Sequence, residues 1–236
     1  MVQTMTATEF HATTDLPDWR FIRTRIETTF AAASFDAAAH FALDVAAAAE
    51  AAAHHPDLDI RYPGLVHIAL TTHAAGGTVT DLDVALAATI SGLAERWGLR
   101  SEPQRAQVCE VAIDAMDIAA VRPFWQALLA YVPEPPHEET GMVVAIVDPS
   151  RIGPAFWFQQ MDAPRPQRNR IHLDITVPAD AAEHRIAAAI AAGGHLVTDE
   201  HARAFWVLAD PEGNEACICT WEDRDDAAPP GGILRS

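Results

Sequence analysis

Residues 50–73, EAAAHHPDLDIRYPGLVHIALTTH, contain the change from helix to strand that decides the fold of the first half of the chain. The alanine-rich part predicts a helix that ends just after His54-His55, because Pro56 cannot continue it. Residues 66–72 then alternate between a face of Val, Ile, Leu and Thr and a face that carries His, which is the period of a half-buried strand. A pair of histidines therefore lies where the helix ends.

The preceding segment predicts a strand followed by the start of this helix. Residues 19–30 alternate between apolar or Thr residues on one face and Arg or Glu on the other. Ser34 is a suitable N-cap, because its hydroxyl can accept a hydrogen bond from the first turn of a helix. We therefore expect one strand over residues 19–30 and a helix over residues 35–53.

The following segment predicts a turn and a last helix. Gly76-Gly77 favour a turn, since glycine adopts backbone conformations that other residues avoid. Apolar residues then recur at helical spacing up to Trp97-Gly98, at Leu82, Leu86, Ile90 and Leu93.

The second half contains a weak internal repeat. Residues 109–130 and 169–194 each predict a strand and then an amphipathic helix, and strand-like segments follow each copy, including MVVAIV and HLVT. Matching order in two copies indicates a duplicated module. The polar stretch 99–107, LRSEPQRAQ, predicts the boundary before it. We expect a first domain over residues 1–99, a second over residues 107–222 and a flexible tail over residues 223–236.

Composition excludes several classes of function. Sixteen basic and 33 acidic residues give a formal charge of -17, which repels phosphate backbones and makes nucleic acid an unsuitable partner. All the basic residues are Arg, so Schiff-base chemistry and a P-loop lysine are excluded. Three cysteines without disulfide or zinc spacing favour a reducing compartment. With no signal peptide or membrane span in the sequence, we expect a cytoplasmic protein.

The histidines of the first half are candidates for acid/base chemistry. Glu50 precedes His54 by four residues, so the two would share a helix face and could form a pair that favours protonated imidazole. His55 and His73 lie nearby in the predicted elements. The alternative is that a histidine near a helix C-terminus is simply favoured by the helix dipole and solvated.

The order and spacing of these residues resemble those of pterin-4a-carbinolamine dehydratases. The resemblance extends over residues 19–98 and is carried by Glu50-x3-His54-His55-Pro56-x5-Tyr62, by Leu70-Thr71-Thr72-His73, by Gly76-Gly77 and by Asp83-Val84-Ala85-Leu86-Ala87. It implies an antiparallel sheet with helices packed on one face, within an α+β fold. The implied activity is the elimination of water from a 4a-hydroxytetrahydropterin without metal or organic cofactor, in a protein that self-associates.

The resemblance also implies roles for individual residues. It assigns acid/base catalysis and pterin binding to His54, His55 and His73, and it assigns a supporting or orienting role to Asp83. It places Glu50, Tyr62 and Thr72 in the substrate-binding set. The sequence does not decide which histidine is the acid and which the base.

Three departures from the family pattern accompany the resemblance. The stretch between Tyr62 and His73 is one residue longer than usual, at Pro63-Gly64. The turn after the glycines is also longer, so that Asp81 or Asp83 could be the family's aspartate; we favour Asp83 because VALA follows it in register. The family's first helix is also short here, which puts the usual assembly surface in doubt.

The second half resembles the glyoxalase-like branch of the vicinal oxygen chelate superfamily. The run GPAFWFQQMDAPRPQRNRIHLDITV and the later LADPEGNEACI carry this resemblance, over residues 107–221. It implies paired βαβββ units that form an open barrel around a pocket.

Members of that superfamily that use a metal take two ligands from each repeat. The corresponding positions here hold Glu110 and Trp157 in the first repeat and His172 and Cys217 in the second. Trp cannot ligate a metal, although Glu215 would face the same way as Cys217 on a strand and could substitute for it. We therefore expect a pocket without a metal, or a pseudo-enzyme, with Glu110, His172 and Glu215 as pocket residues.

Three functions follow in order of preference. The first is a pterin carbinolamine dehydratase that uses histidine acid/base catalysis and carries an added pocket domain of unknown ligand. The second places lyase or isomerase chemistry in the second domain and makes the first domain structural. The third is a binding or assembly protein without catalysis. The complete set of three histidines favours the first, because a scaffold does not need them.

Overall fold

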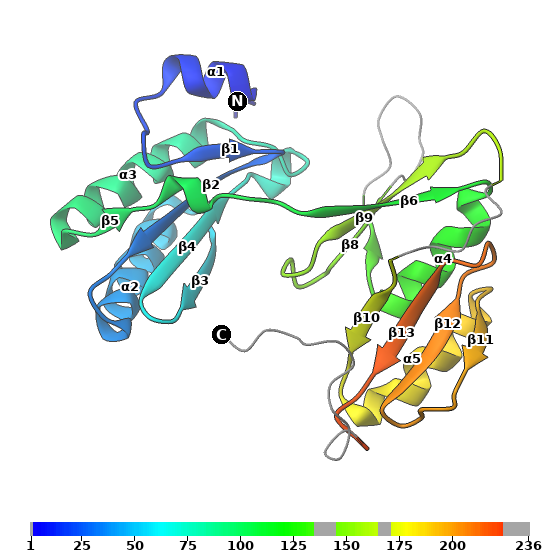
Figure 1. Cartoon of the computed structure of the whole chain (residues 1–236). Helices are drawn as coiled ribbons and strands as arrows, with labels where there is room; N and C mark the ends of the chain where they lie inside the picture. Colours follow the sequence, from blue (N-terminus) through cyan, green and yellow to red (C-terminus); the bar gives the residue numbers. More distant parts are fainter. Residues whose placement is uncertain (1, 135–144, 165–170, 224–236) are drawn as a thin grey trace. The chain divides into compact units, whose positions relative to one another are not determined.

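The computed structural model describes residues 2–134, 145–164 and 171–223 and divides into two compact units, Met1–Val108 and Cys109–Ser236 (Figure 1). We call them the first and the second unit. The predicted tail lies outside the described residues from residue 224 onward. Within the described ranges, no helix has the length and apolar character needed to cross a membrane.

The first unit is an antiparallel sheet with helices. The strand order is β1-β2-β4-β3, and β5 also pairs with β2. Its strands are β1 (Arg20–Ile22), β2 (Arg25–Ala31), β3 (Asp57–Arg61), β4 (Leu65–Leu70) and β5 (Arg100–Ser101). Its helices are α1 (Ala7–Thr13), α2 (Phe35–Ala52) and α3 (Asp81–Trp97), with the short 3-10 turns η1 (His73–Ala75) and η2 (Pro103–Arg105).

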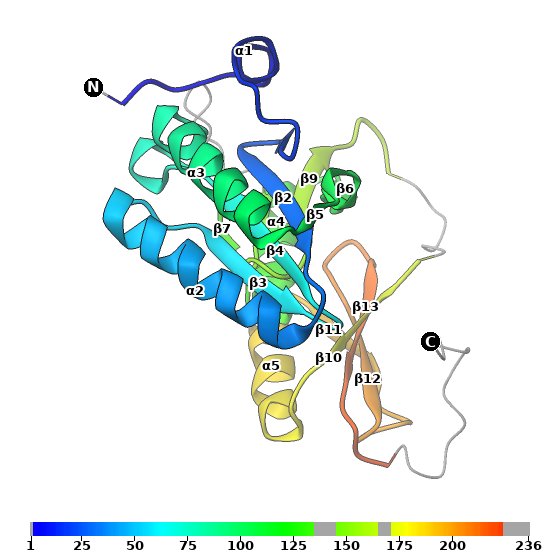
Figure 2. The same ribbon diagram turned by 90° about the vertical axis from the view of Figure 1, so that its left-hand side faces the viewer.

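The two long helices pack on one face of this sheet, as predicted. Figure 2 shows α2 and α3 side by side across β2, β4 and β3. Every second residue of the strands faces the helices, so that Ile26 and Ile68 are buried together with Phe41 of α2 and Ile90 of α3. Each such side chain contributes about 1.5–3 kcal/mol through its burial. The α+β prediction for this half is confirmed.

The ends of α2 and α3 follow from local sequence. The Ser34 hydroxyl accepts a hydrogen bond from the Ala37 N–H at 3.1 Å, which confirms it as the N-cap of α2. Ala53 ends α2 in the left-handed conformation with φ of 49°. Thr80 and Asp83 form a capping box at the start of α3, and Gly98 ends that helix with φ of 63°.

Two details of the predicted strands were wrong. The single strand over residues 19–30 is a hairpin of β1 and β2, because the chain reverses at Arg23, which has φ of 57°. The strand β3 was not predicted; it pairs with β4 throughout its length. In addition, the expected boundary stretch 99–107 contains β5, which belongs to the sheet of the first unit.

The second unit consists of two βαβββ repeats, as predicted. The first repeat runs β6 (Glu110–Ala115), α4 (Ile118–Leu129), β7 (Val132–Pro133), β8 (Ala145–Val147) and β9 (Ala155–Gln160). The second runs β10 (Leu173–Thr176), α5 (Ala179–Ala191), β11 (His195–Thr198), β12 (Phe205–Ala209) and β13 (Glu215–Cys219). In each repeat the first strand pairs in parallel with the last. The predicted strand over residues 142–147 is β8 only in part, since residues 142–144 lie outside the described ranges.

One hydrophobic core joins the two repeats of the second unit. It contains Ile113 and Phe156 from the first repeat and Ala216 and Ile218 from the second, together with residues of both helices. The other face of each sheet carries the alternate residues. The positions that matched the superfamily's metal ligands lie on that second face.

Candidate functional site

A histidine and a carboxylate are paired in the interior of the first unit. His54 follows Ala53, whose left-handed backbone ends α2, and the ring of His54 is largely buried. His54 Nε2 lies 2.7 Å from Asp83 Oδ1. A carboxylate accepts hydrogen bonds, so Nε2 carries the proton and donates it to this bond. Nδ1 is then the ring nitrogen through which His54 can exchange a proton with another molecule.

Asp83 is fully buried and is fixed on several sides. Its Oδ2 accepts hydrogen bonds from the Thr72 hydroxyl at 2.7 Å, the Thr80 N–H at 2.7 Å and the Thr80 hydroxyl at 3.1 Å. Asp83 also lies in the first turn of α3, where the helix dipole favours a negative charge. The carboxylate is therefore held in place by α3 and by the segment that follows β4.

Glu50 does not pair with His54, contrary to prediction. Its Oε1 lies 3.1 Å from Nε2 of His55, and both side chains are exposed. The helical spacing of four residues fails because α2 ends at Ala52 and the left-handed Ala53 turns His54 away from the face that carries Glu50. The carboxylate that reaches His54 comes from a helix that begins 27 residues later in the chain.

The remaining predicted residues of the first unit divide into buried and exposed positions. Thr72 is buried, and its hydroxyl contacts Asp83 and Thr80. His73 is exposed at the start of η1, and Tyr62 is 89% exposed. Because Thr72 is bound to Asp83, the chain segments that carry His54-His55 and His73 meet at this carboxylate.

Asp83, rather than Asp81, occupies the position next to the histidine. Asp81 is exposed and accepts a hydrogen bond from the Gln3 N–H at 3.2 Å. Thr80 was not predicted as part of the site, although it donates two hydrogen bonds to Asp83. The available signal was the spacing of Thr80 and Asp83, which is that of a capping box at the start of a predicted helix.

The four superfamily metal positions of the second unit do not fit a metal centre that takes ligands from both repeats. Glu110 is an exposed residue at the start of β6, and Trp157 on β9 has no donor atom for a metal. His172 immediately precedes β10, and Cys217 is buried on β13. Burial raises the pKa of the Cys217 thiol to about 12, and the Asp174 carboxylate adds to this increase.

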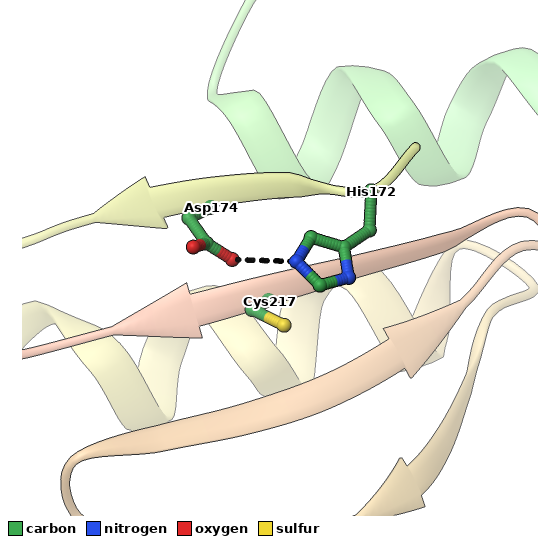
Figure 3. Close-up of side chains that lie close together, drawn as sticks. All are labelled: His172, Asp174 and Cys217. Carbon is green, nitrogen blue, oxygen red and sulfur yellow. Dashed lines mark ion pairs between the residues drawn. The ribbon is translucent and has the colours of Figure 1, made fainter. Parts of the chain in front are cut away.

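Asp174 is the residue of the second unit that sequence analysis missed. Together with His172 and Cys217 it forms the one group of three metal-binding side chains found among the described residues (Figure 3). Glu215, the predicted substitute for Cys217, is not part of this group.

Comparisons with known proteins cover both units. Residues 3–93 match the family model described as pterin 4 alpha carbinolamine dehydratase, and residues 110–219 match that of a glyoxalase-like domain. A protein of Chloroflexus aurantiacus named "Putative pterin-4-alpha-carbinolamine dehydratase" is 55% identical over 74 residues, which are 31% of this chain and 77% of its own length. A protein of the same name from Nocardia farcinica is 49% identical over 80 residues, 34% of this chain and 82% of its own.

Two solved structures resemble one half of the chain each. The crystal structure of a transcriptional coactivator/pterin dehydratase from Brucella melitensis is 28% identical and aligns with 39% of this chain and 99% of its own, with a TM-score of 0.36. That of a glyoxalase/bleomycin resistance protein/dioxygenase family enzyme from Burkholderia phytofirmans is 22% identical and aligns with 49% of this chain and 98% of its own, with a TM-score of 0.38.

Proposed function

Since the chain belongs to the pterin-4a-carbinolamine dehydratase family through its first unit, we propose that this unit removes water from a 4a-hydroxytetrahydropterin to give a quinonoid dihydropterin. The observation that carries the proposal is the buried pair of His54 and Asp83, in which the carboxylate is fixed by Thr72 and Thr80. The reaction needs no metal or organic cofactor in this unit.

The reaction requires two proton transfers. The bond between C4a and its hydroxyl oxygen breaks, and the oxygen takes up a proton and leaves as water. A ring nitrogen of the pterin loses a proton, and its electron pair completes the new double bond. Imidazole is suited to both transfers because its ordinary pKa lies near neutrality.

We assign one of these transfers to Nδ1 of His54. Its Nε2–H is bound to Asp83, which fixes the tautomer and the orientation of the ring. When Nδ1 accepts the proton from the pterin, the adjacent carboxylate stabilises the imidazolium that forms. This division of roles is the one found in other aspartate–histidine pairs of enzymes.

The exposed histidines provide the second transfer and contacts to the pterin. His55 follows His54 directly and is paired with Glu50, and His73 follows Thr72. The two are thus connected to the same buried carboxylate through their neighbours in the chain.

Turnover by the full chain tests this proposal. Freshly generated 4a-hydroxytetrahydropterin is mixed with the protein, and its dehydration is followed against buffer alone. We expect acceleration, and we expect His54→Ala to lower kcat/KM about 100- to 10,000-fold, the usual contribution of a general acid or base. The matched control is His40→Ala, an exposed histidine on the same helix, which should keep full activity. Absence of acceleration by folded protein would contradict the proposal.

A further inference from the structure

Three side chains with different metal-binding atoms meet on one pair of strands in the second unit. His172 and Asp174 are two residues apart at β10 and therefore point to the same side of the sheet. Asp174 lies directly opposite Cys217 in the parallel register of β10 and β13. Figure 3 shows the carboxylate of Asp174 facing the imidazole of His172, with the Cys217 side chain beside them on the neighbouring strand. Their ligand atoms all lie within 4.8 Å of each other.

This side of the sheet is not the hydrophobic core. The alternate residues of the same strands, Leu173, Ile175, Ala216 and Ile218, pack into the core of the unit. About half of the surface of the His172 and Asp174 side chains is exposed, whereas Cys217 is buried at the base of the group. His172 and Asp174 can therefore meet a cation from solvent, and the Cys217 thiol lies within 4.8 Å of their ligand atoms.

The nature of the donors selects the class of cation. Imidazole nitrogen, thiolate sulfur and carboxylate oxygen together are typical ligands of zinc, whereas magnesium and calcium prefer oxygen alone. Tetrahedral zinc, with bonds of about 2.0–2.3 Å, places its ligand atoms about 3.3–3.8 Å apart. The separation of His172 Nε2 from Asp174 Oδ1 is already 3.6 Å.

We propose that His172, Asp174 and Cys217 bind one zinc-like divalent cation, with a fourth position open to water or to a small ligand. The Cys217 thiol gives up its proton to solvent as the bond between sulfur and metal forms. All three ligands come from the second repeat. The first repeat has Ala112 opposite Trp157 at the positions that correspond to Asp174 and Cys217, so it has no such group. The proposed site therefore differs from a centre that is shared between the repeats, and the proposal departs from the expectation of a pocket without a metal.

Cobalt(II) titration of the full chain tests this site. The protein carries no His-tag, is freed of metal with a chelator and is kept reduced; cobalt(II) is then added alone. We expect about one equivalent to bind, with a thiolate-to-cobalt charge-transfer absorption that zinc(II) removes by competition. His172→Ala should weaken binding at least about 10- to 100-fold, since loss of a partner outside the ligand shell already has that effect. Cys217→Ser should abolish the charge-transfer absorption.

Matched variants separate this site from its alternatives. Cys219→Ser changes the buried thiol two residues further along β13 and should leave binding and absorption unchanged. Glu110→Gln should also leave cobalt(II) binding unchanged. If this variant lost binding, the centre would be shared by the two repeats and the proposal would be overturned. Failure to bind cobalt(II), or binding without the thiolate absorption, would equally overturn it. His172 is exposed, so His172→Ala tests the site without risk to the fold, and dehydratase turnover should be unchanged in that variant.

Discussion

The two units each contain a fully buried aspartate, and the two aspartates are used differently. Asp83 in the first unit is bound to His54, Thr72 and Thr80, so that it orients a candidate catalytic histidine. Asp210 in the second unit accepts hydrogen bonds from the indole N–H of Trp125 at 2.9 Å and from the side chain of Asn214 at 2.7 Å. It also accepts from the backbone of its own loop.

This difference shows that a motif typical of a family can reflect the way the unit folds and not the position of a functional site. The DPEGNE motif supports the glyoxalase-like resemblance, yet its residues mainly connect the two repeats. Besides the contact of Asp210 with α4, Glu212 accepts hydrogen bonds from the Met116 and Asp117 N–H groups at the start of that helix. The metal-binding group of the second unit lies on other residues.

The largest effect is expected when the carboxylate of the first unit is removed. Asp83→Ala leaves His54 and two threonines without their buried partner. Because each buried polar group left unsatisfied costs about 1–3 kcal/mol, we expect the free energy of unfolding of the first unit to fall by about 3 kcal/mol or more. Urea unfolding followed by circular dichroism and tryptophan fluorescence measures this loss. Asp81→Ala, in the same turn of α3, is the control; it loses only an exposed hydrogen bond from the Gln3 N–H and should lower stability by less than about 1.5 kcal/mol. Equal losses in the two variants would show that Asp83 has no special role in the network.

A smaller effect, confined to the second unit, is expected for its buried aspartate. Asp210→Ala leaves the buried indole N–H of Trp125 unsatisfied, which costs about 1–3 kcal/mol. The unfolding transition of the second unit should move to lower urea, while dehydratase turnover should be unchanged. Asp199→Ala, at an exposed position, serves as the control. A loss of dehydratase turnover in Asp210→Ala would contradict this expectation, because it would show that the activity of the first unit depends on the stability of the second.

The parts of this structure that could be predicted from sequence are those set by local pattern. The N-cap Ser34, the two long helices of the first unit and the repeated order of the second unit all follow from spacing within a few turns. The hairpin of β1 and β2 was missed because its turn at Arg23 carries no glycine or asparagine signal. The strand β3 was missed because only five residues alternate there.

The parts that could not be predicted depend on contacts between distant segments. The partner of His54 was misassigned because a left-handed Ala53 changes which helix supplies the carboxylate, and no residue type marks that conformation in the sequence. Asp174 was missed because its neighbour Cys217 is 43 residues away and is placed by the register of two parallel strands. The residue spacing of the dehydratase family identified Asp83. The four metal positions of the vicinal oxygen chelate superfamily did not include Asp174.

The smallest predicted effect concerns a third buried carboxylate, Glu27 of β2, on the face of the first sheet opposite the helices. Burial alone would raise its pKa, but the imidazole of His67, 3.6 Å away, and the Arg25 guanidinium outweigh burial and hold the pKa below its ordinary value of 4.5. Arg20 lies opposite Glu27 on β1, and Asp59 of β3 contacts the other side of His67 at 3.7 Å.

A lowered pKa means that, as the pH falls, the unfolded chain takes up a proton before the folded chain does. The stability contributed by Glu27 is therefore full above about pH 4.5 and is lost as the pH falls through the folded-state pKa. We therefore expect Glu27→Gln to be less stable than the unchanged protein near neutral pH. The difference should be only about 1 kcal/mol, because the partners of Glu27 are partly exposed, and it should shrink as the pH falls below about 4.5. Urea unfolding at a series of pH values measures it, with the exposed Glu95→Gln as control; a difference independent of pH would show that the ionised form of Glu27 does not stabilise the sheet.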